Sequence, residues 1–220
     1  MIMNRPKIII NCAMSLDGKI ASPKGKQVRI SSEEDMARVY QLRNKVDAVL
    51  VGINTVINDD PKLTVKERYV SCLHQPIRIV LDPKNKTPEH ALIVNDKAKT
   101  IIIIDENTTI SKAYGENVTV LPFPTDNGVF NLRKLGEKFH DLGISSFLVE
   151  GGGTIIWNFI TSQLVDELYV YIGSLIIGGK QTPTMAMGIG FEHEQDFIKL
   201  QLIETNSIGD GLLLHYQLKK

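Results

Sequence analysis

The sequence predicts an α/β protein with a mostly parallel central sheet, helices on both faces of that sheet and an antiparallel hairpin at the C-terminal end. Two observations support this prediction. Apolar runs with the length of buried strands alternate with amphipathic, helix-like segments over most of the 220 residues. Two strand-like runs then follow within residues 200–218, joined by the Gly209-Asp210-Gly211 turn, and Asp-Gly between apolar runs is typical of a hairpin.

Seven short apolar runs are predicted to be strands of the sheet. Each consists mainly of apolar residues, chiefly Ile, Val and Leu, and most are bounded by polar or turn-forming residues. These runs are residues 7–13, 46–51, 77–81, 100–104, 118–121, 144–149 and 165–172. Because most of them are continuously apolar rather than alternating, we expect them to be buried on both faces.

The predicted helices carry residues that stabilise a helix N-terminus or a buried helix face. Ser31 and Glu34 form a capping-box pattern, and Glu33, Glu34 and Asp35 place negative charge where the helix dipole favours it. The other predicted helices span residues 52–58, 131–142 and 154–163, the last two with apolar residues at helical spacing. Residues 14–27 and 178–190 are rich in turn-forming residues and are predicted loops.

Composition limits the class of protein. The 25 Lys and Arg residues balance the 25 Asp and Glu residues, so the chain lacks the basic excess that nucleic-acid or membrane-surface partners usually require. No apolar stretch approaches the roughly 20 residues of a membrane span, and the N-terminus does not have the form of a signal peptide. With no repeat, low-complexity tract or linker, we expect one cytoplasmic domain that covers residues 1–220.

The strongest chemical signal is the run Gly151-Gly152-Gly153-Thr154 between a predicted strand and a predicted helix. Glycines let the backbone approach a phosphate closely, and the free N–H groups and the dipole of the helix attract its charge. The alternative is a tight turn that only needs positive φ, but one glycine would satisfy such a turn. The run is neither a dinucleotide-binding fingerprint of the Rossmann type nor a Walker motif.

A second signal follows the predicted strand 46–51. Residues 52–58 place a short helix at the carboxyl end of that strand, where open α/β sheets bind ligands. Thr55 can donate a hydrogen bond to a phosphate or a ribose, and Asp59 can accept one from a ribose hydroxyl. The alternative interpretation is a polar helix end followed by an Asp-Pro turn, and local features do not decide between the two.

The remaining polar residues give weaker signals. A basic set consists of Lys19, Lys24, Lys26, Arg29, Arg43 and Lys66. A solvated surface explains most such residues, but Arg43 is in register with the apolar face of a predicted helix. Cys12 stands inside an apolar run and is expected to be a buried thiol. The histidines and cysteines form no metal or nucleophile pattern, and the zinc deaminase signature is absent, so no metal is expected.

These residues resemble the riboflavin-pathway reductase domain family. The segment Ser15-Leu16-Asp17-Gly18-Lys19 is similar to the opening motif of that family. Similar blocks follow in the same order at residues 29–31, 42–43, 51–56, 59–65, 76–82, 149–154, 164–167 and 177–179. The resemblance extends over nearly the whole chain. It is strongest to the stand-alone archaeal and fungal type, the 2,5-diamino-6-ribosylamino-4(3H)-pyrimidinone 5′-phosphate reductases.

The resemblance implies a dihydrofolate-reductase-like fold, a homodimer and NADPH, although the residues do not distinguish NADPH from NADH. It implies that the cofactor binds at Ala13, Thr55, Asp59, Gly151, Gly152, Gly153 and Thr154. It implies that the phosphorylated substrate binds at Arg29, Arg43, Leu63, Lys66 and Glu150. Bacterial members carry a lysine at the position of Asn11 and often an aromatic residue at that of Arg29, so this chain departs from them at both positions.

The implied reaction reduces the ribosylamino group to a ribitylamino group, after the sugar opens to an imine at C1′. On this hypothesis Arg43 and Lys66 bind the 5′-phosphate and Glu150 binds the pyrimidine. Asn11 orients the sugar, and Asp59 or a water handles the proton. The archaeal resemblance favours reduction before deamination. Two alternatives stay open: a dihydrofolate-type pterin reductase of the same fold, and a catalytically silent protein that only binds a nucleotide.

Overall fold

The computed structural model describes residues 5–219, which fall into two compact units, each of which is described by itself. The first unit contains residues up to Lys7 together with Tyr40–Leu148, and the second contains Ile8–Val39 and Val149–Lys220. Helix α1 (Glu33–Asn44) and strand β8 (Ser146–Gly151) each contribute residues to both units. Both units are built from strands and helices, as the α/β prediction requires.

Four parallel strands form the sheet of the first unit, in the order β2-β3-β4-β5. Their bounds are Ala48–Gly52 for β2, Ile77–Leu81 for β3, Thr100–Asp105 for β4 and Val118–Phe123 for β5. All five residues of β2 are buried, as expected for a strand covered on both faces. This burial explains the uninterrupted apolar run at residues 46–51 in the sequence.

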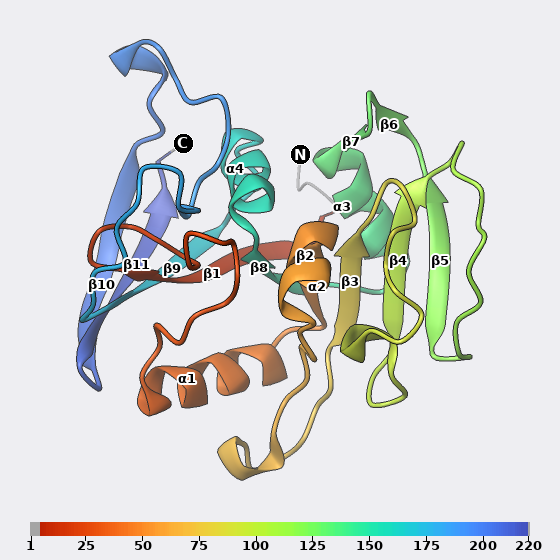
Figure 1. Ribbon diagram of the computed structural model, residues 1–220, viewed down its shortest axis with the longest axis horizontal. Helices are drawn as coiled ribbons and strands as arrows, with labels where there is room; N and C mark the ends of the chain where they lie inside the picture. The colour runs from red at the N-terminus through yellow and green to blue at the C-terminus, as the bar shows by residue number, and fades with distance from the viewer. Residues whose placement is uncertain (1–4, 220) are drawn as a thin grey trace. The chain divides into compact units, whose positions relative to one another are not determined.

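Helices cover both faces of these strands. In Figure 1, α2 (Ile53–Asp59) lies in front of them and α3 (Leu132–Asp141) behind them. Helix α3 begins at its N-cap Asn131, whose side chain accepts a hydrogen bond from the Lys134 N–H. Its buried Phe139 meets Phe147 edge to face, with ring centres 5.6 Å apart.

Short elements complete the first unit. They are the 3₁₀ turns η1 (Glu67–Tyr69) and η2 (Leu92–Val94) and the two-residue strands β6 (Thr125–Asp126) and β7 (Val129–Phe130). Arg78 of β3 is fully buried and donates to the backbone carbonyls of Asn95 and Ala98. This side chain belongs to one of the resemblance blocks, and its contacts give it a structural role in fixing the loop before β4.

The second unit combines parallel and antiparallel strands. Strand β1 (Lys7–Ser15) pairs in parallel with β9 (Glu167–Gly173), and β9 pairs antiparallel with β11 (Gly211–Leu218). Strand β10 (Leu200–Ile208) pairs with β11 as the predicted C-terminal hairpin. Helix α4 (Gly153–Thr161) follows β8, and the 3₁₀ turn η3 (Glu194–Asp196) precedes β10.

The predicted hairpin with its Gly209-Asp210-Gly211 turn is confirmed, with Gly209 and Asp210 between the strands and Gly211 as the first residue of β11. Gly209 has φ +58°, a value that favours glycine at the first central position of such a turn. A Cβ at Gly209 would also lie 2.4 Å from Ser32 Oγ. The turn is therefore placed by its contact with the start of α1 as well as by its own sequence.

The start of α1 differs from the prediction by one residue. Ser32, not Ser31, is the capping residue, because its hydroxyl accepts a hydrogen bond from the Asp35 N–H and its carbonyl accepts one from the Met36 N–H. Both serines can act as a cap, so the sequence alone does not choose between them. Elsewhere the predicted strands and helices are found within two residues of their expected ends.

Candidate functional site

The three glycines between β8 and α4 form a tight turn, called here the glycine turn (Gly151–Gly153). Gly151 has φ +117°, and the Gly151–Gly152 peptide bond is cis. Gly152 is the N-cap of α4 and brings no side chain to the helix end. The N–H groups of the first helical turn have no partner within the helix, so they are available to an anion.

Gly153 is packed too closely for any other residue. A Cβ there would lie 2.4 Å from the Thr184 carbonyl oxygen and 2.8 Å from Met187 Cγ. The Met187 N–H donates to the Gly153 carbonyl at 3.1 Å, which holds the following loop against the turn. The glycines therefore serve two purposes, since one permits the positive φ and another permits this close approach.

The opening motif of the resemblance holds the same loop at a second point. The Asp17 carboxylate accepts hydrogen bonds from the Ser15 hydroxyl and from the N–H groups of Ile177 and Gly178. The bond from Ser15 and then those from the loop backbone lower the pKa of Asp17 to about 2. Asp17 is therefore ionised under ordinary conditions and fixes the loop that runs on to Met187.

Asn11 and Ala13 lie on one face of β1, where they pair with Tyr169 and Tyr171 of β9. Asn11 is buried, and its Oδ1 accepts a hydrogen bond from Arg38 Nη2 at 2.7 Å. This bond fixes the amide so that its NH₂ group points away from Arg38. No sequence pattern indicated a role for Arg38, which belongs to α1 and is far from Asn11 along the chain.

A buried carboxylate holds Arg38 in turn. Asp35 Oδ1 accepts a hydrogen bond from Arg38 Nε at 2.8 Å, and the Asp35 side chain is almost fully buried. The guanidinium also lies over the ring of Tyr169, 5.9 Å from its centre. Burial, followed by the hydrogen bond to Glu167, raises the pKa of Tyr169 to about 12, so its hydroxyl stays protonated.

In the first unit, α2 carries Thr55 and Asp59 at the carboxyl end of β2, as predicted. Both side chains are half-buried. Asp60 forms the end of the helix with φ 42°, and its carboxylate accepts a hydrogen bond from the Leu92 N–H. Asp60 thus supplies a structural contact from the end of this helix to the next loop.

Arg43 and Lys66 are brought together, although 23 positions separate them in the sequence. The Arg43 Cζ lies 5.5 Å and the Lys66 Nζ 5.1 Å from the centre of the Tyr40 ring. Leu63, also predicted for the substrate, is buried with φ 49° in the turn that leads to Lys66. We call Tyr40, Arg43, Lys66, Arg68 and Tyr69 the cation cluster; of these, the sequence had singled out only Arg43 and Lys66.

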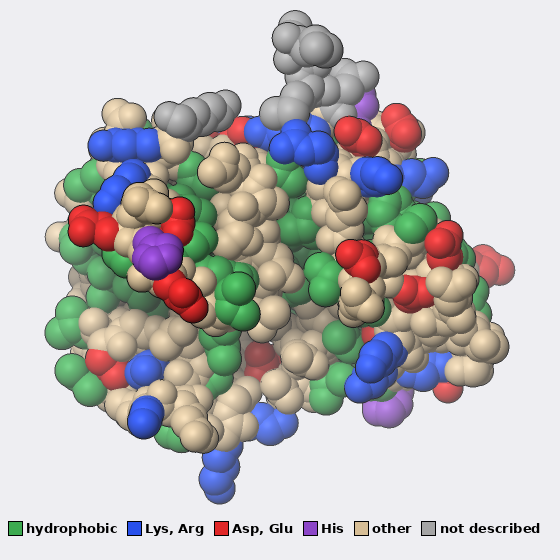
Figure 2. Space-filling model, turned by 90° about the horizontal axis from the view of Figure 1, so that it is seen from above, with side chains coloured by type: hydrophobic (Ala, Val, Ile, Leu, Met, Phe, Trp, Pro, Cys, Tyr) green, Lys and Arg blue, Asp and Glu red, His purple; other side chains and the backbone are tan. Residues whose placement is uncertain are grey.

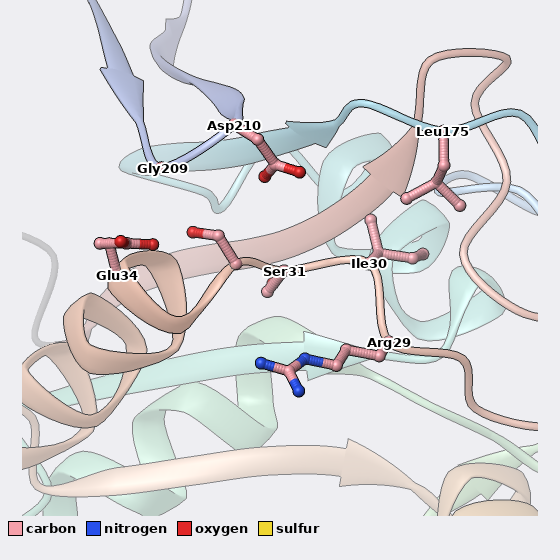
Figure 3. A pocket seen from close by; sticks show the side chains of 8 residues that line it. Arg29, Ile30, Ser31, Glu34, Leu175, Gly209 and Asp210 are labelled. Carbon is pink, nitrogen blue, oxygen red and sulfur yellow. The ribbon is translucent and has the colours of Figure 1, made fainter.

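Arg29 lies at a pocket of about 440 Å³ in the second unit, shown in Figure 3. Its guanidinium lies beneath Ser31 in that view, and the Asp210 carboxylate points toward the pocket from the hairpin turn. Arg29 Nη2 is 2.7 Å from the Glu33 carboxylate, and both side chains are largely exposed. Exposed pairs of this kind contribute little to stability, so Arg29 can exchange this partner for another anion.

The other predicted residues are located as follows. Glu150 is half-buried in β8, directly before the glycine turn, and Thr154 is exposed in the first turn of α4. Burial raises the pKa of the Cys12 thiol to about 12, as expected for an unreactive core cysteine.

Within residues 5–219 no cluster of His, Cys, Asp and Glu has the arrangement of a metal site. No helix in that same range is both long and apolar enough for a membrane crossing.

Comparisons with known proteins find similar sequences over nearly the whole chain. The sequence model of the RibD C-terminal domain matches residues 6–214. A Methanothermobacter thermautotrophicus protein named 2,5-diamino-6-ribosylamino-4(3H)-pyrimidinone 5′-phosphate reductase is 37% identical over 98% of this chain and 99% of its own length. The protein of the same name from Archaeoglobus fulgidus is also 37% identical, over 94% of this chain and 95% of its own.

Solved structures show the same fold. A deaminase/reductase from Thermotoga maritima superposes with a TM-score of 0.82 over 98% of this chain at 23% identity. The present chain spans 57% of that bacterial protein. The riboflavin biosynthesis reductase Rib7 of Saccharomyces cerevisiae superposes with a TM-score of 0.76, at 21% identity, over 98% of this chain and 91% of its own.

Proposed function

Because the chain belongs to the RibD C-terminal domain family, we propose that it is the riboflavin-biosynthesis reductase that acts on 2,5-diamino-6-ribosylamino-4(3H)-pyrimidinone 5′-phosphate. The observation that carries this proposal is the 37% identity to the archaeal reductases over nearly the full length of both chains. The reaction converts the ribosylamino group to a ribitylamino group. No observation favours a pterin reductase or a catalytically silent nucleotide-binding protein.

We propose NADPH as the hydride donor, with NADH as the alternative to be tested. When bound, the nicotinamide cofactor supplies a hydride to C1′ of the substrate. The glycine turn fits a dinucleotide, because it presents unpaired backbone donors at a helix start and has no side chain at Gly152 to block a phosphate. We assign Gly151, Gly152, Gly153 and Thr154 to the cofactor, and in the first unit Thr55 and Asp59. Ala13 on β1 is assigned to it as well.

The chain's own residues have to bind and orient the substrate. Ring opening breaks the C1′–O4′ bond, transfers the amine proton to O4′ and forms a C1′=N imine, and reduction then adds a hydride to C1′ and a proton to nitrogen. We assign Asn11 to sugar orientation, because its amide NH₂ is directed away from Arg38 and is available to a ligand oxygen. We assign Asp59, directly or through a water, to the proton transfer.

The remaining assignments concern the phosphorylated substrate. Arg43 and Lys66 would bind its 5′-phosphate, and their common contact with Tyr40 supports this pairing. Arg29, with its exposed and exchangeable ion pair, and Leu63 are assigned to the same substrate. Glu150 would accept hydrogen bonds from the pyrimidine amino groups.

We also propose a cytoplasmic homodimer with no nucleic-acid or membrane partner. Lys and Arg side chains are interspersed with Asp and Glu on the face in Figure 2, in agreement with the balanced composition. One face of the terminal hairpin carries Leu202, Leu212, Leu214 and Tyr216, none of which is buried. An uncharged apolar face of this kind can meet its own copy without charge repulsion. Sedimentation at micromolar concentration tests this, and a monomer would contradict it.

The decisive experiment follows NADPH absorbance with the aminated and the deaminated ribosylamino substrate, and with dihydrofolate as the control. Oxidation with the aminated substrate alone is expected. Oxidation only with dihydrofolate would replace the proposal by a pterin reductase. Tight NADPH binding without oxidation of any substrate would instead indicate a silent nucleotide-binding protein. The same assay with NADH determines the cofactor preference.

A further inference from the structure

The aromatic residue at the centre of the cation cluster has no role in the function proposed above. Tyr40 lies in the second half of α1, and its ring is buried, with 8% of the residue exposed. Tyr69 of η1 stacks on it with ring centres 4.9 Å apart and planes 6° from parallel. One face of the Tyr40 ring is therefore covered by Tyr69.

Two cations approach this ring from different segments. Arg43 follows Tyr40 by three residues in the same helix, so the two side chains are neighbours on its surface. Lys66 comes from the turn directly before η1. Two like charges brought together repel each other, but the negative face of an aromatic ring attracts both. The Tyr40 ring thus offsets part of the cost of holding these two positive charges near each other.

The backbone around Lys66 is held independently of the ring. The Val65 N–H donates to Gln75 Oε1 at 2.8 Å, and Gln75 Nε2 donates back to the Val65 carbonyl at 2.9 Å. Arg43 Nη1 also donates to the Thr64 carbonyl at 3.2 Å. The Arg43 guanidinium and the backbone next to Lys66 are thereby anchored, and the ring fixes where the end of the flexible Lys66 side chain lies.

A third cation supports the stack from outside. Arg68 Cζ lies 4.6 Å from the centre of the Tyr69 ring, and its Nη2 donates to the Tyr69 hydroxyl at 2.6 Å. Tyr69 is therefore held between Arg68 and Tyr40. Arg68 is exposed and Tyr69 half-buried, whereas Tyr40 is buried, so the order of the layers runs from the surface inward.

We propose that Tyr40, supported by Tyr69, is a positioning residue that holds Arg43 and Lys66 as one binding site for the substrate's phosphate. This inference rests on the proposed function, since it assigns a purpose to the two cations named there. The proposal predicts a difference between two replacements of Tyr40 that simple core packing does not predict. If the ring acts through its π face, phenylalanine can replace Tyr40 and leucine cannot.

The test compares Tyr40→Leu with Tyr40→Phe, using ribose 5-phosphate binding by calorimetry and steady-state kinetics of the full-length protein. Tyr40→Leu is expected to weaken ribose 5-phosphate binding and raise substrate KM about tenfold, as expected for the loss of two cation–π contacts. We expect kcat and NADPH KM to change much less. Tyr40→Phe should recover affinity to within about twofold of the wild type.

A substrate without the 5′-phosphate provides the readout that a packing role would not affect. If Tyr40 acts through the phosphate site, Tyr40→Leu and the wild type should have equal KM for this dephosphorylated substrate. An equal loss on both substrates would overturn the inference, and so would equal behaviour of the Leu and Phe variants. If Tyr40→Leu does not fold, Tyr69→Leu decides, since unchanged ribose 5-phosphate affinity in that variant also contradicts the proposal.

Arg43→Ala separates this inference from the proposed function. If Arg43→Ala leaves ribose 5-phosphate affinity unchanged, the phosphate assignment itself is wrong, and the role of Tyr40 is wrong with it. If Arg43→Ala weakens binding and Tyr40→Leu does not, only the positioning role is wrong. Lys62→Ala removes an exposed lysine four positions before Lys66 and serves as the matched control for a general loss of charge.

Discussion

The glycine turn and the cation cluster, which we propose as two anion sites, would bind their anions by opposite means. The glycine turn has no charged side chain and presents backbone N–H groups at the start of α4. The cation cluster presents the charged groups of Arg43 and Lys66 around one aromatic ring. The first site depends on the absence of side chains and the second on their presence, so the two should respond to different substitutions.

The two sites also differ in how they are held in place. The loop between Ile177 and Met187 packs on the glycine turn through backbone contacts. Asp17 binds the start of this loop through the N–H groups of Ile177 and Gly178. The cation cluster is held by stacking and cation–π contacts between side chains. Backbone geometry is rigid and intolerant of added atoms, whereas a side-chain stack adapts to conservative replacement. The predictions below test this difference, from the largest expected effect to the smallest.

The largest effect is expected for Gly152→Val. The φ of Gly152, −65°, is one that any residue adopts. The valine side chain would nevertheless keep a phosphate from the N–H groups of α4, and we expect NADPH affinity to fall about 100-fold. Fluorescence titration with NADPH measures this, and thermal unfolding checks the fold. Gly136→Ala, in α3, where a Cβ would make only ordinary van der Waals contacts at 4.0 Å with Arg5 and Pro6, is the control. Retained NADPH binding would contradict the backbone site.

A smaller effect is expected for Arg43→Ala. Loss of one charge-assisted contact to the phosphate should raise substrate KM about 30-fold, while NADPH affinity changes little. Initial rates over a range of both ligands separate the two constants. Parallel losses for substrate and NADPH would show that the two anion sites are not independent. An unchanged substrate KM would remove Arg43 from the phosphate site.

The two ends of α1 allow a finer separation. Ser32→Ala removes the hydrogen bond to the Asp35 N–H and should lower the free energy of unfolding by about 1 kcal/mol. Ribose 5-phosphate binding should not change, because Arg43 lies in the last turn of α1, at the opposite end of the helix from Ser32. Ser31→Ala, which removes the serine that is not the cap, is the matched control in urea unfolding. Equal losses in the two variants would show that the cap is wrongly assigned.

The smallest effect concerns pH and the loop on the glycine turn. Asp17 has a pKa of about 2 in the folded protein, below its ordinary value of 3.8, so its contribution to stability is present above about pH 4. That contribution is lost as the pH falls through about 2. The stability difference between the wild type and Asp17→Asn should therefore be constant near neutrality and shrink in acid. A stability difference between the two proteins that grows as the pH falls would contradict the lowered pKa of Asp17.

Much of the fold followed from local patterns. The strand 77–81 was predicted to the residue, and the glycine run, the helix at Asn131 and the terminal hairpin were all located correctly. These features depend on short-range chemistry: apolar runs, capping side chains and positive φ. The choice of Ser32 over Ser31 as the cap could not be predicted from local patterns, because both serines can cap a helix. Ser32, the one that caps α1, also lies next to Gly209 of the hairpin turn.

The candidate sites also combine features that the sequence predicted with features that only the folded structure shows. The amino-acid sequence by itself determined that a glycine turn precedes α4 and that Arg43 and Lys66 are basic residues of a recognisable family. Only the tertiary structure decided that these two cations share the ring of Tyr40, that Tyr69 and Arg68 support it, and that Arg38 orients Asn11. The physical reason is distance along the chain. A turn or a cap is encoded by neighbours, whereas a stack of side chains from two segments exists only after the chain has folded.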